Sequence, residues 1–225
     1  MTGKVKVAIA VPTLALLTLG ATLWLNRPFQ VELASFRTSL ADRTEAQRHN
    51  IRQAAMALDG VVIEPGETFS FNQVVGPRTP ERGYREAPAF MELDLVKSIG
   101  GGVCQVSSTV YNAAALAGMA IVERHSHSRR VASVPPGRDA TVWYGMTDFR
   151  FLNAQHSPVR LSARVSSETL YVSVSGRSVV GRQVSIITEP LAFSSGKHLF
   201  QTVRATTVTG SLTRIERLSL DEYDK

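Results

Sequence analysis

A run of three glycines leads directly into the only cysteine of the chain, and this stretch constrains the fold more than any other. Gly100, Gly101 and Gly102 come just before Cys104, and apolar residues then recur at helical spacing from 106 to 117. The pattern predicts a helix with Cys104 in its first turn, where backbone N–H groups and the helix dipole favour a thiolate. The glycines leave room for a substrate to approach the sulfur. The stretch is typical of a catalytic cysteine, with a buried, unreactive cysteine as the alternative.

Composition and charge narrow the class of protein. Of the 225 residues, 44% are hydrophobic and 20% are charged, which is typical of a globular protein rather than a disordered one. The formal net charge of +6 suits an anionic environment such as a membrane face or a cell-wall polymer. No basic stripe interleaved with aromatic residues is present, so the sequence predicts no nucleic-acid partner. It makes no prediction of the oligomeric state.

The amino-terminal segment predicts export from the cytoplasm. Lys4 and Lys6 precede an uncharged stretch, residues 7–25, which is long enough to span a bilayer and lacks a clear cleavage site. We therefore expect residues 1–27 to be an uncleaved membrane anchor, with a cleaved signal as the alternative. Positive charge before the span favours a single-pass protein of the cell membrane whose C-terminal domain is extracytoplasmic. A single cysteine in an exported chain forms no internal disulfide, so its thiol is buried, paired between chains or kept as a working group.

The remaining patterns predict one longer and one shorter helix among many short strands. Thr44 and Gln47 form a capping box that opens a helix ending at residues 59–60. Strands are expected at 29–36, 61–63, 69–71, 89–96, 120–123, 140–144, 149–152, 158–165 and 169–175, followed by short β-like runs. The predicted class is therefore α+β: a single compact domain with a central helix at the cysteine and mixed short strands, preceded by the transmembrane helix. We expect residues 28–176 to form the main domain and 177–225 a C-terminal β extension of the same unit.

A cysteine nucleophile needs a general base within reach and a group that orients the base. His125 and His127 form a local cluster, and two residues apart on a strand they would point the same way. His127 is slightly favoured because serines flank it, which indicates a polar loop. Asp139 and Asp148 are the alternatives for the orienting carboxylate, and either could instead cap a turn.

Further residues are candidates for binding the substrate or a metal. Arg124 and Arg138 are suited to hold a substrate carboxylate, and the backbone N–H groups of Cys104 and Gln105 are natural donors to an oxyanion. Zinc could be held by the cysteine and the two clustered histidines. Because neither a CxxC nor an HExxH motif is present, we predict no metal and no cofactor.

Several motifs together closely resemble the VanW family, over roughly residues 33–176. They are Pro65–Asn72, Val75–Thr79, Gly83–Tyr84, Gly100–Ser108, Arg124–Ser128 and Pro135–Val142. The family takes its name from an accessory protein of glycopeptide-resistance clusters. Some of its members are L,D-transpeptidases that form 3–3 cross-links in peptidoglycan with a cysteine nucleophile.

The resemblance implies a cell-envelope cysteine acyltransferase that acts on peptidoglycan stem peptides. Cys104 would form the thioester, and the thioester would pass to an amine of a second stem or to water. The implied catalytic residues are Cys104, His127, His125 and Asp139, and the implied substrate-binding residues are Arg138, Arg124, Gly101, Gly102, Gln105 and Ser107. The alternative from another class is a non-catalytic, membrane-tethered accessory protein that binds wall fragments or a partner enzyme.

Overall fold

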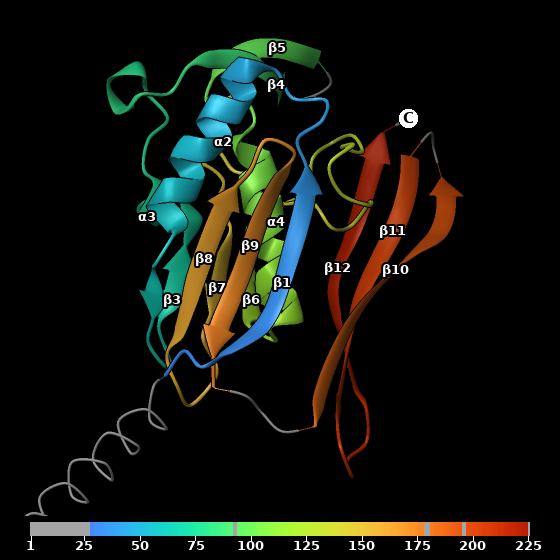
Figure 1. Ribbon diagram of the computed structural model, residues 1–225. Helices are drawn as coiled ribbons and strands as arrows, with labels where there is room; N and C mark the ends of the chain where they lie inside the picture. Colours follow the sequence, from blue (N-terminus) through green and yellow to red (C-terminus); the bar gives the residue numbers. More distant parts are fainter. Residues whose placement is uncertain (1–27, 92–93, 178–180, 195–196, 225) are drawn as a thin grey trace, which may run out of the picture.

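Helix α4 (Val103–Leu116) lies at the centre of the protein, with a four-stranded sheet over one side and helix α2 (Glu45–Leu58) beside it (Figure 1). The structure, a computed structural model, describes residues 28–91, 94–177, 181–194 and 197–224. Twelve of the fourteen residues of α4 are buried, as expected for a helix packed on every face. Many of them are alanine or serine, so neighbouring elements approach the α4 backbone closely.

The large sheet is antiparallel throughout, in the order β1-β9-β8-β2. Its strands are β1 (Val31–Ser39), β9 (Thr169–Gly176), β8 (Val159–Val165) and β2 (Val62–Ile63). β1 and β9 pack on α4, and β8 packs on α2. Leu161 and Val172, on neighbouring strands, are fully buried in the core between this sheet and the helices.

A smaller sheet of order β3-β7-β6 packs on α4 through aromatic side chains. Its strands are β3 (Thr68–Ser70), β7 (Arg150–Leu152) and β6 (Ala120–Glu123). Phe149, just before β7, meets Tyr111 of α4 edge-on, with 5.6 Å between ring centroids. Phe69 and Phe151 stack within the sheet at 4.8 Å. These contacts connect the small sheet to the central helix.

The segment between the small sheet and α4 ends in the glycine run. It comprises α3 (Phe71–Val75), the 3-10 helix η1 (Pro80–Arg82) and the hairpin of β4 (Glu86–Met91) and β5 (Asp94–Ile99). Helix α2 holds this segment through its polar side chains. Asn50 donates to the carbonyl oxygen of Gly101 at 3.0 Å, and Gln47 donates to that of Pro88 at 2.9 Å.

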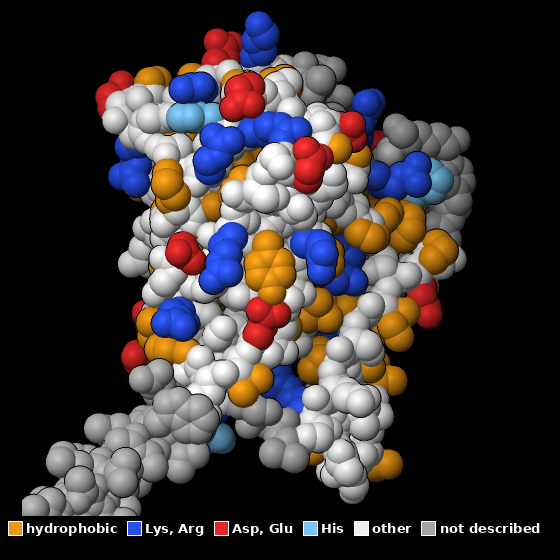
Figure 2. All heavy atoms as spheres, viewed as in Figure 1, with side chains coloured by type: hydrophobic (Ala, Val, Ile, Leu, Met, Phe, Trp, Pro, Cys, Tyr) orange, Lys and Arg blue, Asp and Glu red, His pale blue; other side chains and the backbone are white. Residues whose placement is uncertain are grey.

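A third sheet, the C-terminal sheet, is a meander of three long antiparallel strands at the right of Figure 1. Its strands are β10 (Arg182–Ser194), β11 (Lys197–Val208) and β12 (Arg214–Asp224). Arg204 of β11 donates to the carbonyl oxygens of Ala115 and Met119 at 3.2 and 2.6 Å, which satisfies acceptors at the end of α4. On the face shown in Figure 2, Lys and Arg side chains are interspersed with Asp and Glu rather than gathered into one patch.

The predicted α+β class is wrong, because the described part of the chain is mostly β. It holds twelve strands against three α-helices and one 3-10 helix. The main difference lies in residues 182–224, whose short β-like runs join into three long strands. The predicted transmembrane helix, residues 7–25, lies outside the described residues, and no described helix is long and apolar enough to cross a bilayer.

Two local predictions also differ from the structure, for reasons of hydrogen bonding. Phe71 was expected in a strand but begins α3, because the Ser70 hydroxyl accepts a hydrogen bond from the Gln73 N–H and caps the helix. Residues 140–144 were expected as a strand, yet their one β contact is the bridge between Trp143 and Thr147. That segment bonds instead to serine hydroxyls of α4.

The buried environment of α4 predicts a clear difference between two valine truncations. Val110 of α4 is fully buried, whereas Val122 of β6 is 53% exposed. We expect Val110→Ala to lower the free energy of unfolding by about 2 kcal/mol, because it leaves a cavity in the core. Val122→Ala should change it by less than about 0.5 kcal/mol. Urea denaturation of both variants measures the difference, and equal losses would contradict the central position of α4.

Candidate active site

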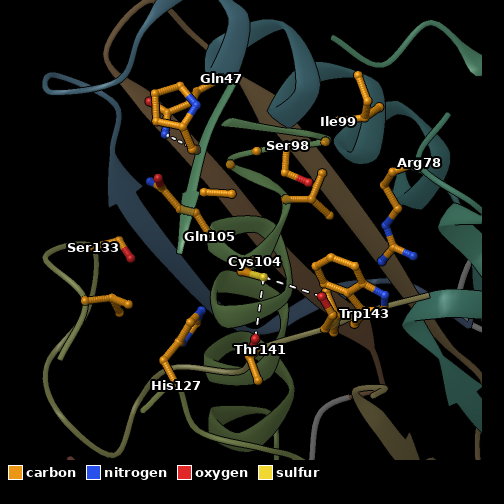
Figure 3. A pocket seen from close by; sticks show the side chains of 18 of the residues that line it. Gln47, Arg78, Ser98, Ile99, Cys104, Gln105, His127, Ser133, Thr141 and Trp143 are labelled. Carbon is orange, nitrogen blue, oxygen red and sulfur yellow. Dashed lines mark hydrogen bonds between the residues drawn. The ribbon is translucent and has the colours of Figure 1, made fainter. Parts of the chain in front are cut away.

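Cys104 is the second residue of α4. Its partly buried side chain faces residues 140–142, which belong to the loop between β6 and β7. Its Sγ lies 3.7 Å from Thr141 Oγ1 and 3.6 Å from the carbonyl oxygen of Val142 (Figure 3). Two hydroxyls of α4 hold that segment in place. Ser107 donates to the Ala140 carbonyl at 2.5 Å, and Ser108 accepts from the Ala140 N–H at 2.9 Å.

His127 points toward the sulfur from the opposite side of the cleft to Trp143 (Figure 3), and its orientation is set by Asp139. Asp139 Oδ2 lies 2.6 Å from Nδ1 of the imidazole and accepts the backbone N–H of the same histidine at 2.7 Å. Because Nδ1 is held by the carboxylate, Nε2 is the ring nitrogen that remains to interact with Cys104. The three side chains follow one another in the order that a nucleophile, a base and an orienting acid would take.

Asp139 is 1% exposed, and its charge is balanced by groups from two directions. Arg124 donates to its Oδ1 at 2.9 Å, and the Tyr223 hydroxyl donates to the same oxygen at 2.5 Å. Arg124 also pairs with Asp221. Tyr223 and Asp221 both belong to β12, so the C-terminal sheet reaches the site. Buried carboxylates are stable only with such partners.

These contacts favour a thiolate–imidazolium pair. Burial raises the pKa of the Cys104 thiol. The interactions with His127, including its charge, lower the pKa by more, so the net pKa lies below the ordinary thiol value. Burial lowers the pKa of His127, but Asp139 and Cys104 raise it, to about 9. Burial raises the pKa of Asp139, and His127 and Arg124 bring it below its usual value. The helix dipole contributes about 0.3–1 kcal/mol in the same direction as His127.

The sulfur opens onto a cleft of about 820 Å³. The glycine run and the exposed rings of Trp143 and Tyr144 line the cleft. Gln105, His127 and Trp143 lie around the sulfur in Figure 3. Three arginines also contribute to its walls: Arg43, Arg78 and Arg130. A cleft of this size accommodates a peptide segment rather than a single small group.

Arg78 is a cleft arginine with a buried, unsatisfied donor. Its Nη1 donates to Asn72 Oδ1 at 2.7 Å and to the Gly76 carbonyl at 3.1 Å, whereas its buried Nη2 has no hydrogen-bond partner among the described residues. The guanidinium also lies over the rings of Phe71 and Tyr144. It is therefore held rigidly beside the cleft, although the protein leaves one of its donors unsatisfied.

Comparison with known proteins identifies the family. The family model of VanW-like proteins matches residues 46–175, more than half of the chain. The chain belongs to the VanW-like family. The matched residues include Cys104, His127 and Asp139 but end before the C-terminal sheet begins.

Two curated relatives of this VanW-like chain are similar over part of their length. The uncharacterized protein YoaR of Bacillus subtilis (strain 168) is 42% identical over 153 residues, which cover 68% of this chain and 50% of that protein. The vancomycin B-type resistance protein VanW of Enterococcus faecalis (strain ATCC 700802 / V583) is 30% identical over 109 residues, which cover 46% of this chain and 40% of that protein. The chain therefore spans about half the length of these relatives or less. No solved structure matches it.

In this VanW-like site, the two histidines and the two aspartates that the sequence left as alternatives occupy different surroundings. His125 lies outside the cleft lining, 52% exposed, with Nε2 3.2 Å from Glu123. Asp148 accepts hydrogen bonds from the Ser70 hydroxyl at 2.5 Å and the Asn72 N–H at 2.8 Å, so it supports the start of α3. Of the two histidines, His127 lines the cleft together with Cys104, and of the two aspartates, Asp139 is the one that holds His127. Among the described residues, no group of three His, Cys, Asp or Glu side chains converges as a metal site.

The residues expected to bind substrate are divided between the cleft and the protein interior. Gly101, Gly102 and Gln105 line the cleft, and Gln105 also donates to the Ser39 carbonyl at 2.8 Å. The other three do not line it. Ser107 is fully buried against Ala140, Arg124 is paired with Asp139 and Asp221, and Arg138 donates to Asn112 and lies over the Phe36 ring.

Sequence reasoning missed several residues of the VanW-like site. Thr141 and Arg78 stand within motifs quoted for the family resemblance, so those motifs were the available signal. Trp143 directly follows the last of them. Tyr223 and Asp221 lie 84 and 97 residues from their partners in the chain, and no local pattern marks them.

The thiolate–imidazolium pair predicts the pH dependence of thiol reactivity. Because His127 lowers the pKa of Cys104, the wild-type protein should react with iodoacetamide well below the pH at which an ordinary thiol ionises. At pH 6.5 the rate should exceed that of a His127→Ala variant by at least about tenfold, because burial raises the pKa of Cys104 once the imidazole that lowers it is removed. His125→Ala should leave the pH profile unchanged. Equal profiles for wild type and His127→Ala would contradict the pair.

Proposed function

We propose that this VanW-like chain is a cysteine acyltransferase that acts on peptidoglycan stem peptides outside the cytoplasm. The observation that carries the proposal is the array of Cys104, His127 and Asp139 at the edge of a peptide-sized cleft. Each group has the environment that its role requires: a sulfur favoured as thiolate, an imidazole in reach of it, and a buried carboxylate on the other ring nitrogen. The substrate class comes from the resemblance to family members that cross-link peptidoglycan.

The proposed reaction begins with attack of the Cys104 thiolate on the carbonyl carbon of a stem peptide bond. The C–N bond then breaks, the protonated His127 gives its Nε2 proton to the departing amine, and a thioester remains on the sulfur. An amine from a second stem, or water, attacks the thioester and loses its proton to His127. The new amide or acid leaves, and the thiolate is restored. These steps require no redox cofactor, because no atom changes its oxidation state.

Backbone geometry supplies a donor for the tetrahedral intermediate. The N–H groups of Val103 and Gln105 donate to the carbonyls of Gly100 and Gly102. The N–H of Cys104 lies in the first turn of α4, where a helix offers no internal acceptor. It therefore has the role that the sequence suggested for both Cys104 and Gln105. The positive end of the α4 dipole adds to the stabilisation of an oxyanion at this point.

Arg78 is the proposed site for a carboxylate of the stem peptide. The sequence suggested Arg124 and Arg138, but both are engaged in the interior. Arg78 lines the cleft and has an unsatisfied donor at Nη2, and its stem packs over Gly100, close to the sulfur. A guanidinium binds a carboxylate with two parallel hydrogen bonds and so fixes the direction of the peptide.

Cys104→Ala tests the reaction directly. The wild-type chain is incubated with purified muropeptides, and the products are separated by mass spectrometry. We expect loss of a terminal amino acid together with cross-linked or hydrolysed stems, and the proportion of the two distinguishes transfer from hydrolysis. Cys104→Ala should abolish both products, whereas His125→Ala should form them at the wild-type rate. Unchanged muropeptides with the wild-type chain would favour the non-catalytic binding protein instead.

Arg78→Gln tests the carboxylate site. The loss of a charged hydrogen bond should raise KM for stem peptides by about tenfold and change kcat much less. A stem peptide with its carboxylates amidated should be processed equally by wild type and variant. Arg160→Gln is the matched control, because Arg160 also lies over an aromatic ring, that of Phe29, outside the cleft. An unchanged KM in Arg78→Gln would remove this residue from substrate binding.

A further inference from the structure

The two residues that activate the sulfur stand on a long irregular segment, here called the histidine loop (residues 124–149). It connects β6 to β7, and within it the structure has turns and isolated bridges but no helix or strand. His127 and Asp139 are twelve residues apart on this loop, and both must be placed accurately against Cys104 on α4. A loop of this length has too little structure of its own to do so, so the positions must be imposed from outside.

The C-terminal sheet contacts the histidine loop in two places, one next to His127 and one next to Asp139. Near His127, the Asp224 N–H donates to the Ser128 carbonyl at 2.8 Å, and Asp224 forms a parallel bridge with Arg129. Near Asp139, Thr202 donates to the Gly137 carbonyl at 3.2 Å. Gly137 fits there only as glycine, because a Cβ at this position would lie 2.2 Å from Thr202 Oγ1.

Tyr223 makes the contact that reaches the catalytic carboxylate. It is fully buried, and its hydroxyl oxygen accepts the Gly137 N–H at 2.7 Å while its O–H donates to Asp139 Oδ1 at 2.5 Å. Because the hydroxyl accepts from the loop backbone, its own hydrogen is directed to the carboxylate. One side chain thus sets the distance between the loop backbone and Asp139.

Asp139 is thereby held at both oxygens. Oδ1 receives Tyr223 and Arg124, and Oδ2 receives the backbone N–H and Nδ1 of His127. The β12 residue Asp221 holds Arg124 from its other side. With both oxygens engaged, the carboxylate cannot rotate, and the imidazole keeps the orientation that turns Nε2 to the sulfur.

We infer that Tyr223 is a positioning residue for the Cys104–His127–Asp139 array, and that the C-terminal sheet is part of the active site rather than an appendage to the VanW-like domain. The inference rests on the proposed function of Cys104. It extends the site beyond residues 46–175, which the family model matches, to the last strand of the structure. The charged and titratable groups around Asp139 are His127, Arg124, Tyr223, Asp221 and Tyr111.

Tyr223→Phe in the full chain tests the inference without any substrate. The rate of Cys104 alkylation by iodoacetamide is measured at pH 6.5 and pH 9.5. Without the hydroxyl, Asp139 and His127 lose their fixed orientation, so we expect the rate at pH 6.5 to fall at least about threefold. At pH 9.5, above the ordinary thiol pKa of about 8.5, ionisation of the sulfur depends less on the imidazole, and the rate should stay within about twofold.

Tyr171→Phe is the matched control. Its hydroxyl also donates to a carboxylate, Glu32 Oε2, at 2.6 Å, but on the large sheet away from the histidine loop. In Tyr171→Phe, the ratio of the Cys104 alkylation rates at pH 6.5 and pH 9.5 should equal that of the wild type. Circular dichroism and the thermal transition verify that each variant is folded. If Tyr223→Phe does not fold, Asp221→Asn is measured in its place, because it releases Arg124 and should lower the pH 6.5 rate in the same way.

A second readout reports only on folded protein. The Nδ1 proton of His127, bound to Asp139, should give a downfield proton NMR signal that shifts or broadens in Tyr223→Phe and stays unchanged in Tyr171→Phe. A folded Tyr223→Phe variant with the wild-type rate ratio and the wild-type signal would overturn the inference while leaving the proposed function intact. A wild-type Cys104 that titrates as an ordinary thiol would overturn the proposed function and the inference together.

Discussion

The burial of one carboxylate governs the arrangement of this protein. Asp139 is almost wholly removed from water. The desolvation free energy of an isolated charge at that depth would exceed the free energy of unfolding of a typical protein. Four groups offset the cost: Arg124, Tyr223 and two nitrogens of His127. They come from the histidine loop and from the last strand, so the carboxylate unites segments that are far apart in the chain. The same carboxylate also orients His127, the proposed catalytic base.

The sulfur depends on this carboxylate only indirectly. Cys104 is presented by α4, whose first turn follows a glycine N-cap with φ of 101°. The histidine loop is attached to the same helix through Ser107 and Ser108, and it carries Thr141 to the sulfur. Nucleophile and base therefore share one rigid support, although 23 positions separate them in the numbering. Rigid support of this kind is what a charge pair needs to persist at neutral pH.

The arginines illustrate why the chemistry of a residue type is insufficient to assign its role. Arg124, Arg138 and Arg78 all have the guanidinium that a carboxylate requires. The first balances two buried aspartates, the second packs on α4 and β1, and the third lines the cleft with an unsatisfied donor. What distinguishes them is whether the guanidinium lines the cleft, as only that of Arg78 among the three does.

The sequence by itself determined the start of α4 and α2, because glycine and capping-box signals act between neighbouring residues. It also predicted Cys104 as the nucleophile and offered two candidates each for the base and the orienting acid. Only the tertiary structure places His127 rather than His125 in the cleft and Asp139 rather than Asp148 against that imidazole, and only it joins the tail of short strands into a long sheet that supplies Tyr223. These outcomes depend on contacts between residues as many as 97 positions apart. The path of the whole chain sets such contacts, and no local pattern records them.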